Sequence, residues 1–174
     1  MKDMRFLPAT VARGDAEERL RRRWPWSERR LELLCLPAWA FRVRVEGAEG
    51  VVLACDALLG RVARMRLQEE DLAVEPPGPV LASRIPPERA LALVTEAARD
   101  LVLGACLREK RRCRLLGVES LGAVGRPFWV RYHVGPLGYG LRACDAVTGA
   151  RADGVQRRAL ALGLVGGFAK LRSS

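Results

Sequence analysis

The chain has 174 residues, of which 49% are hydrophobic and 29% are charged, so it can bury the core of one ordinary domain or of two small ones. Thirty lysines and arginines against twenty acidic residues give a formal net charge of +10, which argues against cationic partners and favours polyanions. No apolar run approaches the roughly 18 residues of a membrane span, and residues 1–7 lack the apolar segment of a secretory signal, so we expect a cytoplasmic protein. Asparagine is absent and Ile85 is the only isoleucine, a composition typical of a GC-rich and thermophilic source.

The first half of the chain predicts a helix followed by a β-hairpin. The helix lies within residues 7–24, is polar, and begins near Asp15 because a glycine precedes this position. Apolar residues alternate with small and basic residues over 39–45, which predicts a half-buried strand with its arginines facing outward. A Gly-containing connection leads to a second strand over 51–55, and residues 30–36 form a further candidate strand.

The second half shows the same order of elements. Three prolines and a glycine near residue 77 predict an extended linker, which we place at 76–85. A helix over 86–112 begins at a Pro-Pro pair, where the fixed φ of proline suits the first helical position. Strands over 128–134 and 140–144 form a second hairpin, and residues 113–121 hold another candidate strand.

Nearly identical heptapeptides, ACDALLG and ACDAVTG, end the two predicted hairpins and lie 89 residues apart. We expect Asp56 and Asp145 to accept backbone N–H groups of a turn, and Gly60 and Gly149 to supply the positive φ that a tight turn needs. The alternative is a catalytic or metal-binding role for the two aspartates. No second carboxylate lies at ligand spacing from either, so we favour the structural role.

The second half resembles a known family. A helix opening IPPERALALVTEAA, a strand FWVRYHV, a Gly-containing turn and the ending LRACDAVTG resemble the PepSY domain over residues 85–150, and residues 7–62 resemble it more weakly. The resemblance implies a small α+β fold without catalytic residues. Such domains are known from protease propeptides and from secreted or membrane proteins, with a proposed role in restraining peptidases, whereas this sequence shows neither a signal nor a span.

Together these patterns predict an α+β fold made of two repeated modules. Each module is expected to be a helix packed on its own small antiparallel β-sheet, with the helix preceding a β-hairpin or meander. The first module would span residues 1–75 and the second 86–174, with the Pro/Gly-rich linker between them.

The sequence contains no motif that indicates catalysis or metal binding. Its five cysteines form no C-x-x-C pair and accompany a single histidine, His133, so we expect no zinc site. We expect buried thiols, with a disulfide as the alternative. P-loop and G-x-S-x-G sequences are absent, so we expect a protein that is not an enzyme and that binds no cofactor.

Two basic segments are candidates for binding polyanions. They are RLRRRWPWSERR at 19–30 and LREKRRCR at 107–114. Arginines interleaved with exposed aromatics are typical of proteins that hold single-stranded nucleic acid, although a solvated surface with local glutamate partners is the alternative. The candidate residues are Arg21, Arg22, Arg23, Arg111, Arg112 and Arg114.

The apolar stretch over 159–169 is expected to close the core or to contact a second copy of the chain in a homodimer, in preference to lying on a membrane surface. Our leading hypothesis for the whole protein is a non-enzymatic binding or structural protein whose ligand is a protein or peptide, held at a free sheet edge or in a groove between the modules. The alternative is a nucleic-acid-binding protein that uses the two basic segments.

Overall fold

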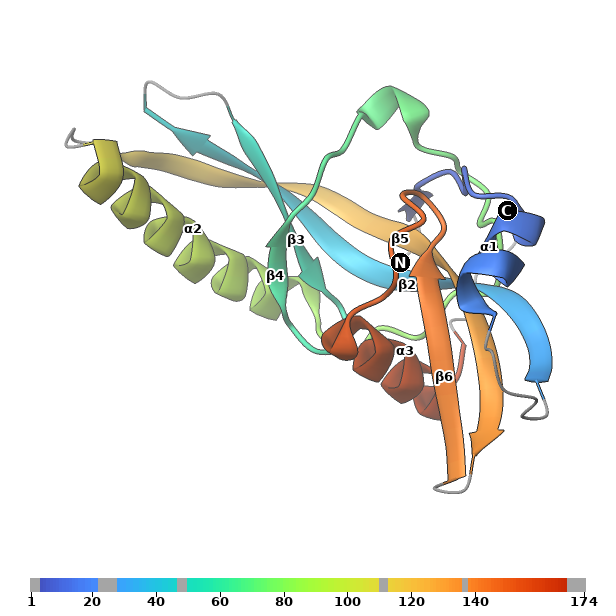
Figure 1. Ribbon diagram of the computed structural model, residues 1–174. Helices are drawn as coiled ribbons and strands as arrows, with labels where there is room; N and C mark the ends of the chain where they lie inside the picture. Colours follow the sequence, from blue (N-terminus) through green and yellow to red (C-terminus); the bar gives the residue numbers. More distant parts are fainter. Residues whose placement is uncertain (1–3, 22–27, 47–49, 110–112, 136–137, 169–174) are drawn as a thin grey trace.

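A computed structural model describes residues 4–21, 28–46, 50–109, 113–135 and 138–168 (Figure 1). Within these ranges three α-helices and a short 3-10 helix surround a single six-stranded sheet, so the fold is mixed α+β. The elements in chain order are β1 (Arg5–Phe6), α1 (Arg13–Leu20), β2 (Glu28–Val45), β3 (Val51–Asp56), β4 (Val62–Arg64), η1 (Glu69–Asp71), α2 (Pro87–Glu109), β5 (Leu115–Gly135), β6 (Gly138–Asp145) and α3 (Gly154–Gly166).

Two long strands dominate the sheet. The candidate strands at 30–36 and 113–121 are not separate elements, because each continues without a break into the first strand of the following hairpin. The resulting strands, β2 and β5, pair antiparallel along almost their whole length, with Leu36 opposite Arg126 near the middle. The strand order is β1-β5-β2-β3-β4, and β6 pairs with β5. The prediction of two modules, each with its own small sheet, is therefore wrong, since both hairpins belong to one sheet.

The helices also cross between the two halves of the chain. The second helix, α2, precedes the second hairpin but packs on β2 and β3 of the first as well as on the start of β5, and the carbonyl oxygen of Ile85 before it accepts a hydrogen bond from Trp39 Nε1 at 2.8 Å. Conversely, α1 precedes the first hairpin but packs on β6 and β5, and the carbonyl oxygen of Val11 accepts from Trp129 Nε1 at 2.9 Å. Each half therefore completes the core of the other.

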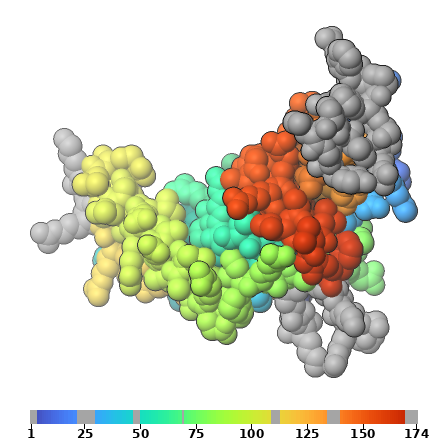
Figure 2. Space-filling model, turned by 90° about the horizontal axis from the view of Figure 1, so that it is seen from below, coloured from blue at the N-terminus to red at the C-terminus, as the bar shows by residue number. Residues whose placement is uncertain are grey.

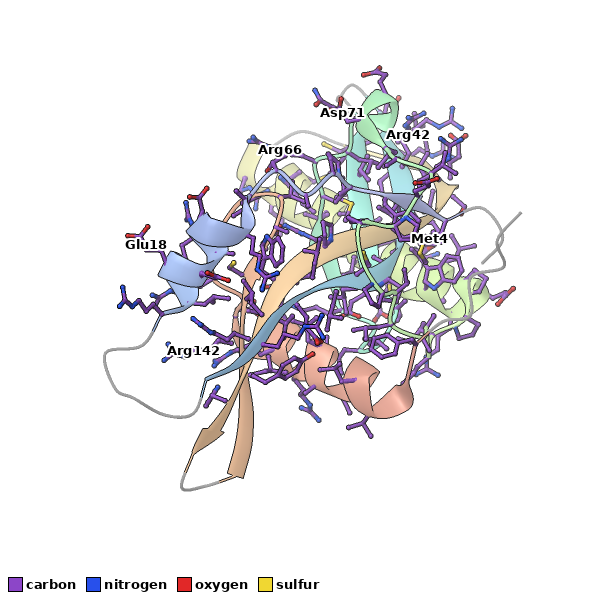
Figure 3. The ribbon with its side chains drawn as sticks, turned by 90° about the vertical axis from the view of Figure 1, so that its right-hand side faces the viewer. Met4, Glu18, Arg42, Arg66, Asp71 and Arg142 are labelled. Carbon is purple, nitrogen blue, oxygen red and sulfur yellow. The ribbon has the colours of Figure 1, made fainter. Side chains whose placement is uncertain are left out.

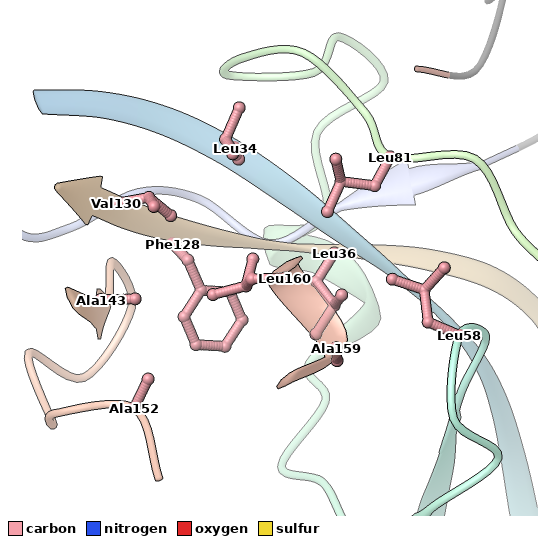
Figure 4. Close-up of a cluster of buried hydrophobic side chains, with 10 residues drawn as sticks. All are labelled: Leu34, Leu36, Leu58, Leu81, Phe128, Val130, Ala143, Ala152, Ala159 and Leu160. Atoms are coloured by element: carbon pink, nitrogen blue, oxygen red, sulfur yellow. The ribbon is translucent and has the colours of Figure 1, made fainter. Parts of the chain in front are cut away.

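The core lies in several clusters along the sheet. One cluster forms beneath α3, where Phe128 and Leu34 from the long strands meet Leu160 (Figure 4). A second forms beneath α2, where Phe41 packs with Val94. Both helices lie on the face seen in Figure 2. Burial of apolar side chains on this scale is the main favourable term in folding.

The segment 76–85, placed as a linker from its composition, contributes to the core at its centre. Val80 and Leu81 are buried. The backbone N–H of Cys35 in β2 donates a hydrogen bond to Pro79 O at 2.8 Å, and the backbone carbonyl of Cys35 accepts one from Leu81 N at 3.0 Å. Gly163 of α3 lies close to Leu81, because a Cβ at that glycine would be 2.6 Å from Leu81 Cδ1. The apolar C-terminal stretch thus covers the core through α3.

A capping box begins α3 and supports a testable prediction. Asp153 Oδ1 accepts from Gln156 N at 2.7 Å, and Gln156 Oε1 accepts from Asp153 N at 3.0 Å. The hydrogen bond from Gln156 N, with a smaller contribution from the charge of Arg61, lowers the pKa of Asp153. The stability that the Asp153 carboxylate contributes is therefore fully present above the pKa of an unfolded aspartate and is lost as the pH falls through the lowered pKa of the folded protein. We expect Asp153→Ala to lower the free energy of unfolding by about 1 kcal/mol at pH 7 and by less at pH 3. Urea denaturation at the two pH values measures this, with Asp153→Asn as the control that keeps the acceptor. An equal loss at both pH values would contradict the assignment.

No helix in the described parts of the chain has both the length and the apolar composition needed to cross a bilayer.

Candidate peptide-binding edge

The two aspartates of the repeated heptapeptides hold turns of the same geometry. Asp56 Oδ1 accepts the backbone N–H groups two and three residues later, at 2.7 and 3.4 Å, and Asp145 Oδ1 does the same at 2.8 and 3.3 Å. Gly60 and Gly149 follow with φ of 75° and 72°, values that favour glycine. Each carboxylate is thus engaged by its own turn, and among the described residues no three acidic, Cys or His side chains gather as metal ligands do.

The surroundings of these two carboxylates differ. Asp145 is only 2% exposed and forms an ion pair with Arg126 Nη2, and the Arg126 guanidinium lies 5.9 Å from the centre of the Phe128 ring. Burial raises the pKa of Asp56, and no described cation forms an ion pair with it. The turns are therefore alike in hydrogen bonding and unlike in electrostatics.

The described parts of the two basic segments lie far apart. Arg21 follows α1 at one end of the molecule, whereas Arg114 precedes β5 at the opposite end (Figure 1). Arg21 lines a shallow pocket of about 370 Å³ together with two glutamates of α1 and Arg131. The other candidates lie outside the described residues: Arg22, Arg23, Arg111 and Arg112. Nucleic-acid binding stays a prediction.

Several arginines near α1 serve the fold. Arg142 Nη1 donates to Leu20 O at 3.4 Å, and Arg151 Nη2 donates to Arg19 O at 3.0 Å. Both carbonyls belong to the last turn of α1, where the helix dipole favours cations. Figure 3 shows Arg142 beneath this end of the helix, with Glu18 on its outer side. Some of the arginines therefore serve to hydrogen-bond the last carbonyl groups of α1.

A groove of about 600 Å³ follows the outer edge of the first part of β2. Its floor and walls are mostly apolar, and three charged side chains, one of them acidic, lie at its rim. The main apolar residues are Leu31, Leu33, Pro77, Pro79, Trp129 and Phe168. The charged ones are Arg13, Arg30 and Glu32. Both halves of the chain line this groove.

In the described parts of the chain, the first part of β2 has no paired strand on its outer side, where the groove lies. On its outer side β2 pairs with β3 only from Ala38 to Val43 and with Val80 at Cys35. Because Cys35 directs its N–H and C=O to that side and backbone groups alternate along a strand, those of Leu33 and Leu31 point outward as well. Within the described ranges no strand pairs with this side of β2 from Leu31 to Leu34.

The chain that bounds the groove does not complete the sheet. Gly78 lies against Leu33 O so closely that a Cβ there would be 2.3 Å from the oxygen, so this segment covers the Leu33 carbonyl. Pro77 and Pro79 have no N–H to donate, so this segment cannot run beside β2 as a paired strand. The Pro/Gly composition that predicted a linker thus leaves an edge open.

Sequence reasoning placed a ligand at a free sheet edge or between modules, but it did not identify the residues of this groove. Residues 30–36 are a candidate strand in the sequence, yet nothing in that stretch tells which side of the strand stays unpaired. Comparison of the chain with protein-family models, curated proteins and solved structures gave no match. The resemblance to the PepSY domain stays a prediction.

Proposed function

We propose that the protein binds an extended segment of a partner protein, which adds a strand to the outer edge of β2. The observation that carries this proposal is the outward-directed backbone of Leu31, together with the outward N–H of Leu33, inside an apolar groove. A strand added at such an edge gains affinity from main-chain hydrogen bonds and specificity from alternate side chains that enter the groove. Trp129 and the half-exposed Phe168 supply apolar surface for those side chains.

Charge complementarity points to an acidic segment with alternating apolar residues. Arg13 and Arg30 lie at the rim, and the chain as a whole carries a formal charge of +10. Arg30 Nε is 3.9 Å from Glu32 Oε1 in an exposed pair, an arrangement of little energetic value, so Arg30 is able to turn to a ligand carboxylate. A positive protein also attracts an acidic ligand over distance, which raises the association rate at low salt.

Fluorescence anisotropy with the full chain and a labelled peptide of about eight residues that alternates valine and glutamate tests the proposal. We expect Phe168→Ala to weaken binding about tenfold, because the ring loses apolar contact with the ligand. Arg30→Glu is expected to weaken it about fivefold at low salt and less at high salt. Matched controls on other surfaces are Val165→Ala and Arg89→Glu, which should change the affinity less than twofold.

A change to the peptide backbone alone distinguishes strand addition from binding that uses only the peptide side chains. A peptide N-methylated at alternate residues keeps its side chains but loses main-chain donors, and we expect its binding to fall at least tenfold. Equal binding of the two peptides, or an equal effect of Arg89→Glu and Arg30→Glu, would refute the proposal. Light scattering of the peptide-free protein tests a second copy as the occupant, since a dimer that Phe168→Ala dissociates would also contradict a partner peptide.

A further inference from the structure

Two half-buried cysteines meet where α2 ends and β5 begins. Cys113 donates its backbone N–H to Cys106 Sγ at 3.1 Å, and Cys106 Sγ lies 3.6 Å from Cys113 O. The end of α2 and the start of β5 lie at the opposite end of the molecule from the first part of β2 (Figure 1). Neither cysteine takes part in the peptide-binding proposal.

This geometry is compatible with a disulfide. With an N–Cα bond of about 1.46 Å, the Cys113 Cα lies within about 4.6 Å of Cys106 Sγ. A disulfide needs Cβ atoms about 3.5–4.5 Å apart, and rotation about χ1 swings each Sγ around its fixed Cβ, which lets two neighbouring sulfurs approach each other. Both residues are half-buried, in contrast to the fully buried cysteines of the strands.

The other three cysteines have a different environment. Cys35, Cys55 and Cys144 are buried strand residues with essentially no exposed surface. Burial raises the pKa of Cys35 and of Cys55 to about 11 and also raises the pKa of Cys144. Such thiols stay protonated and shielded at neutral pH, and they provide an internal control for reactivity.

The surrounding sequence favours an anionic reagent. Segment 107–114 contains five lysines and arginines and one glutamate, so the two cysteines lie in a strongly cationic part of the chain. Cations near a site attract anionic ligands. Glutathione disulfide, which carries a net negative charge, has the matching chemistry.

We propose that Cys106 and Cys113 form a thiol–disulfide exchange site that takes an anionic low-molecular-weight disulfide as its oxidant. One cysteine loses its proton to solvent, and its thiolate attacks a sulfur of the small disulfide, which forms a mixed disulfide and releases one small thiolate. The second cysteine then loses its proton and attacks the protein sulfur of the mixed disulfide, which releases the second small thiolate. Two protein thiols are oxidised and one small disulfide is reduced to two thiols. The new bond ties the end of α2 to the start of β5.

Mass mapping of the full chain tests this site. The reduced protein is incubated with glutathione disulfide, its free thiols are alkylated under denaturing conditions, and it is digested with trypsin. We expect the Cys106 and Cys113 peptides to be joined, with two hydrogens fewer, while the three buried cysteines are alkylated. Dithiothreitol should reverse the bond, and the oxidised form should melt about 5 °C higher because a short ring is closed.

Single variants separate the two steps. In Cys106→Ser we expect a stable glutathione adduct on Cys113, and in Cys113→Ser an adduct on Cys106, because no second thiol resolves either one. Persistent adducts in the wild-type protein, full alkylation of all five cysteines, or a bond between two chains would each overturn the proposal. These outcomes are read directly by mass and do not depend on whether a peptide binds at β2.

Discussion

Asp145→Asn is expected to lower the free energy of unfolding by about 3–5 kcal/mol, whereas Asp56→Asn should change it by less than about 1 kcal/mol. Asparagine keeps an Oδ1 acceptor for the N–H groups of each turn, so the comparison isolates the charge. At Asp145 the charge is buried and paired with Arg126. Removing it leaves the guanidinium partly buried without its ion pair, and its Nε already lacks a hydrogen-bond partner.

Among the described residues, the turn at Asp56 has no such ion pair, and the stability that Asp56 contributes is expected to depend on pH. Burial raises the pKa of Asp56 above that of the unfolded chain, so between the two values the folded protein binds more protons. The contribution of Asp56 to stability is therefore fully present below the unfolded pKa and is lost as the pH rises through the folded one. Relative to Asp56→Asn, the wild type should gain stability as the pH is lowered from 7 to below 4.

Urea denaturation of the wild type and the two variants at several pH values measures both effects. Equal losses for Asp56→Asn and Asp145→Asn at pH 7 would show that the ion pair with Arg126 is not what distinguishes the two turns. Asp145→Ala provides a further check. It removes the turn acceptor as well, and its additional cost should be about 1 kcal/mol.

Phe128→Ala is expected to cost about 3–5 kcal/mol of unfolding free energy. The Phe128 ring is fully buried among Leu34, Val130 and Leu160, at the point where β2, β5 and α3 meet (Figure 4). Truncation removes its apolar contacts and leaves a cavity that the two long strands and the helix cannot close by a small shift. Of the core substitutions in this cluster, it deletes the largest side chain.

Phe168→Ala is the matched control for this substitution. Its ring is 52% exposed and lines the groove, so we expect a loss of less than about 1 kcal/mol. If the dependence of the unfolding free energy on denaturant concentration is the same in the wild type and both variants, the two effects arise in the folded state. A similar loss for the two variants would mean that the groove wall, and not the cluster beneath α3, holds α3 on the sheet. A small loss also shows that Phe168→Ala is folded in the peptide-binding experiment.

Local features of this chain follow from its sequence. Period-two alternation at 39–45 and 128–134 predicts the hairpin strands, and the Pro-Pro pair before α2 predicts the start of that helix. The Asp and Gly residues of each heptapeptide specify a turn through contacts only two to four residues apart. These features were predictable because the groups that produce them are close neighbours in the chain.

The tertiary structure alone decided which elements pair. The sequence of 30–36 is equally compatible with a strand of a small separate sheet and with the first part of an 18-residue strand. The pairing of β2 with β5 merges the hairpins, and the hydrogen bond from Trp129 Nε1 to Val11 O, 118 residues apart, joins the start of the first half to the second hairpin. A periodic pattern determines that a face is apolar but not which distant segment covers it, so the open edge of β2 became visible only in the folded chain.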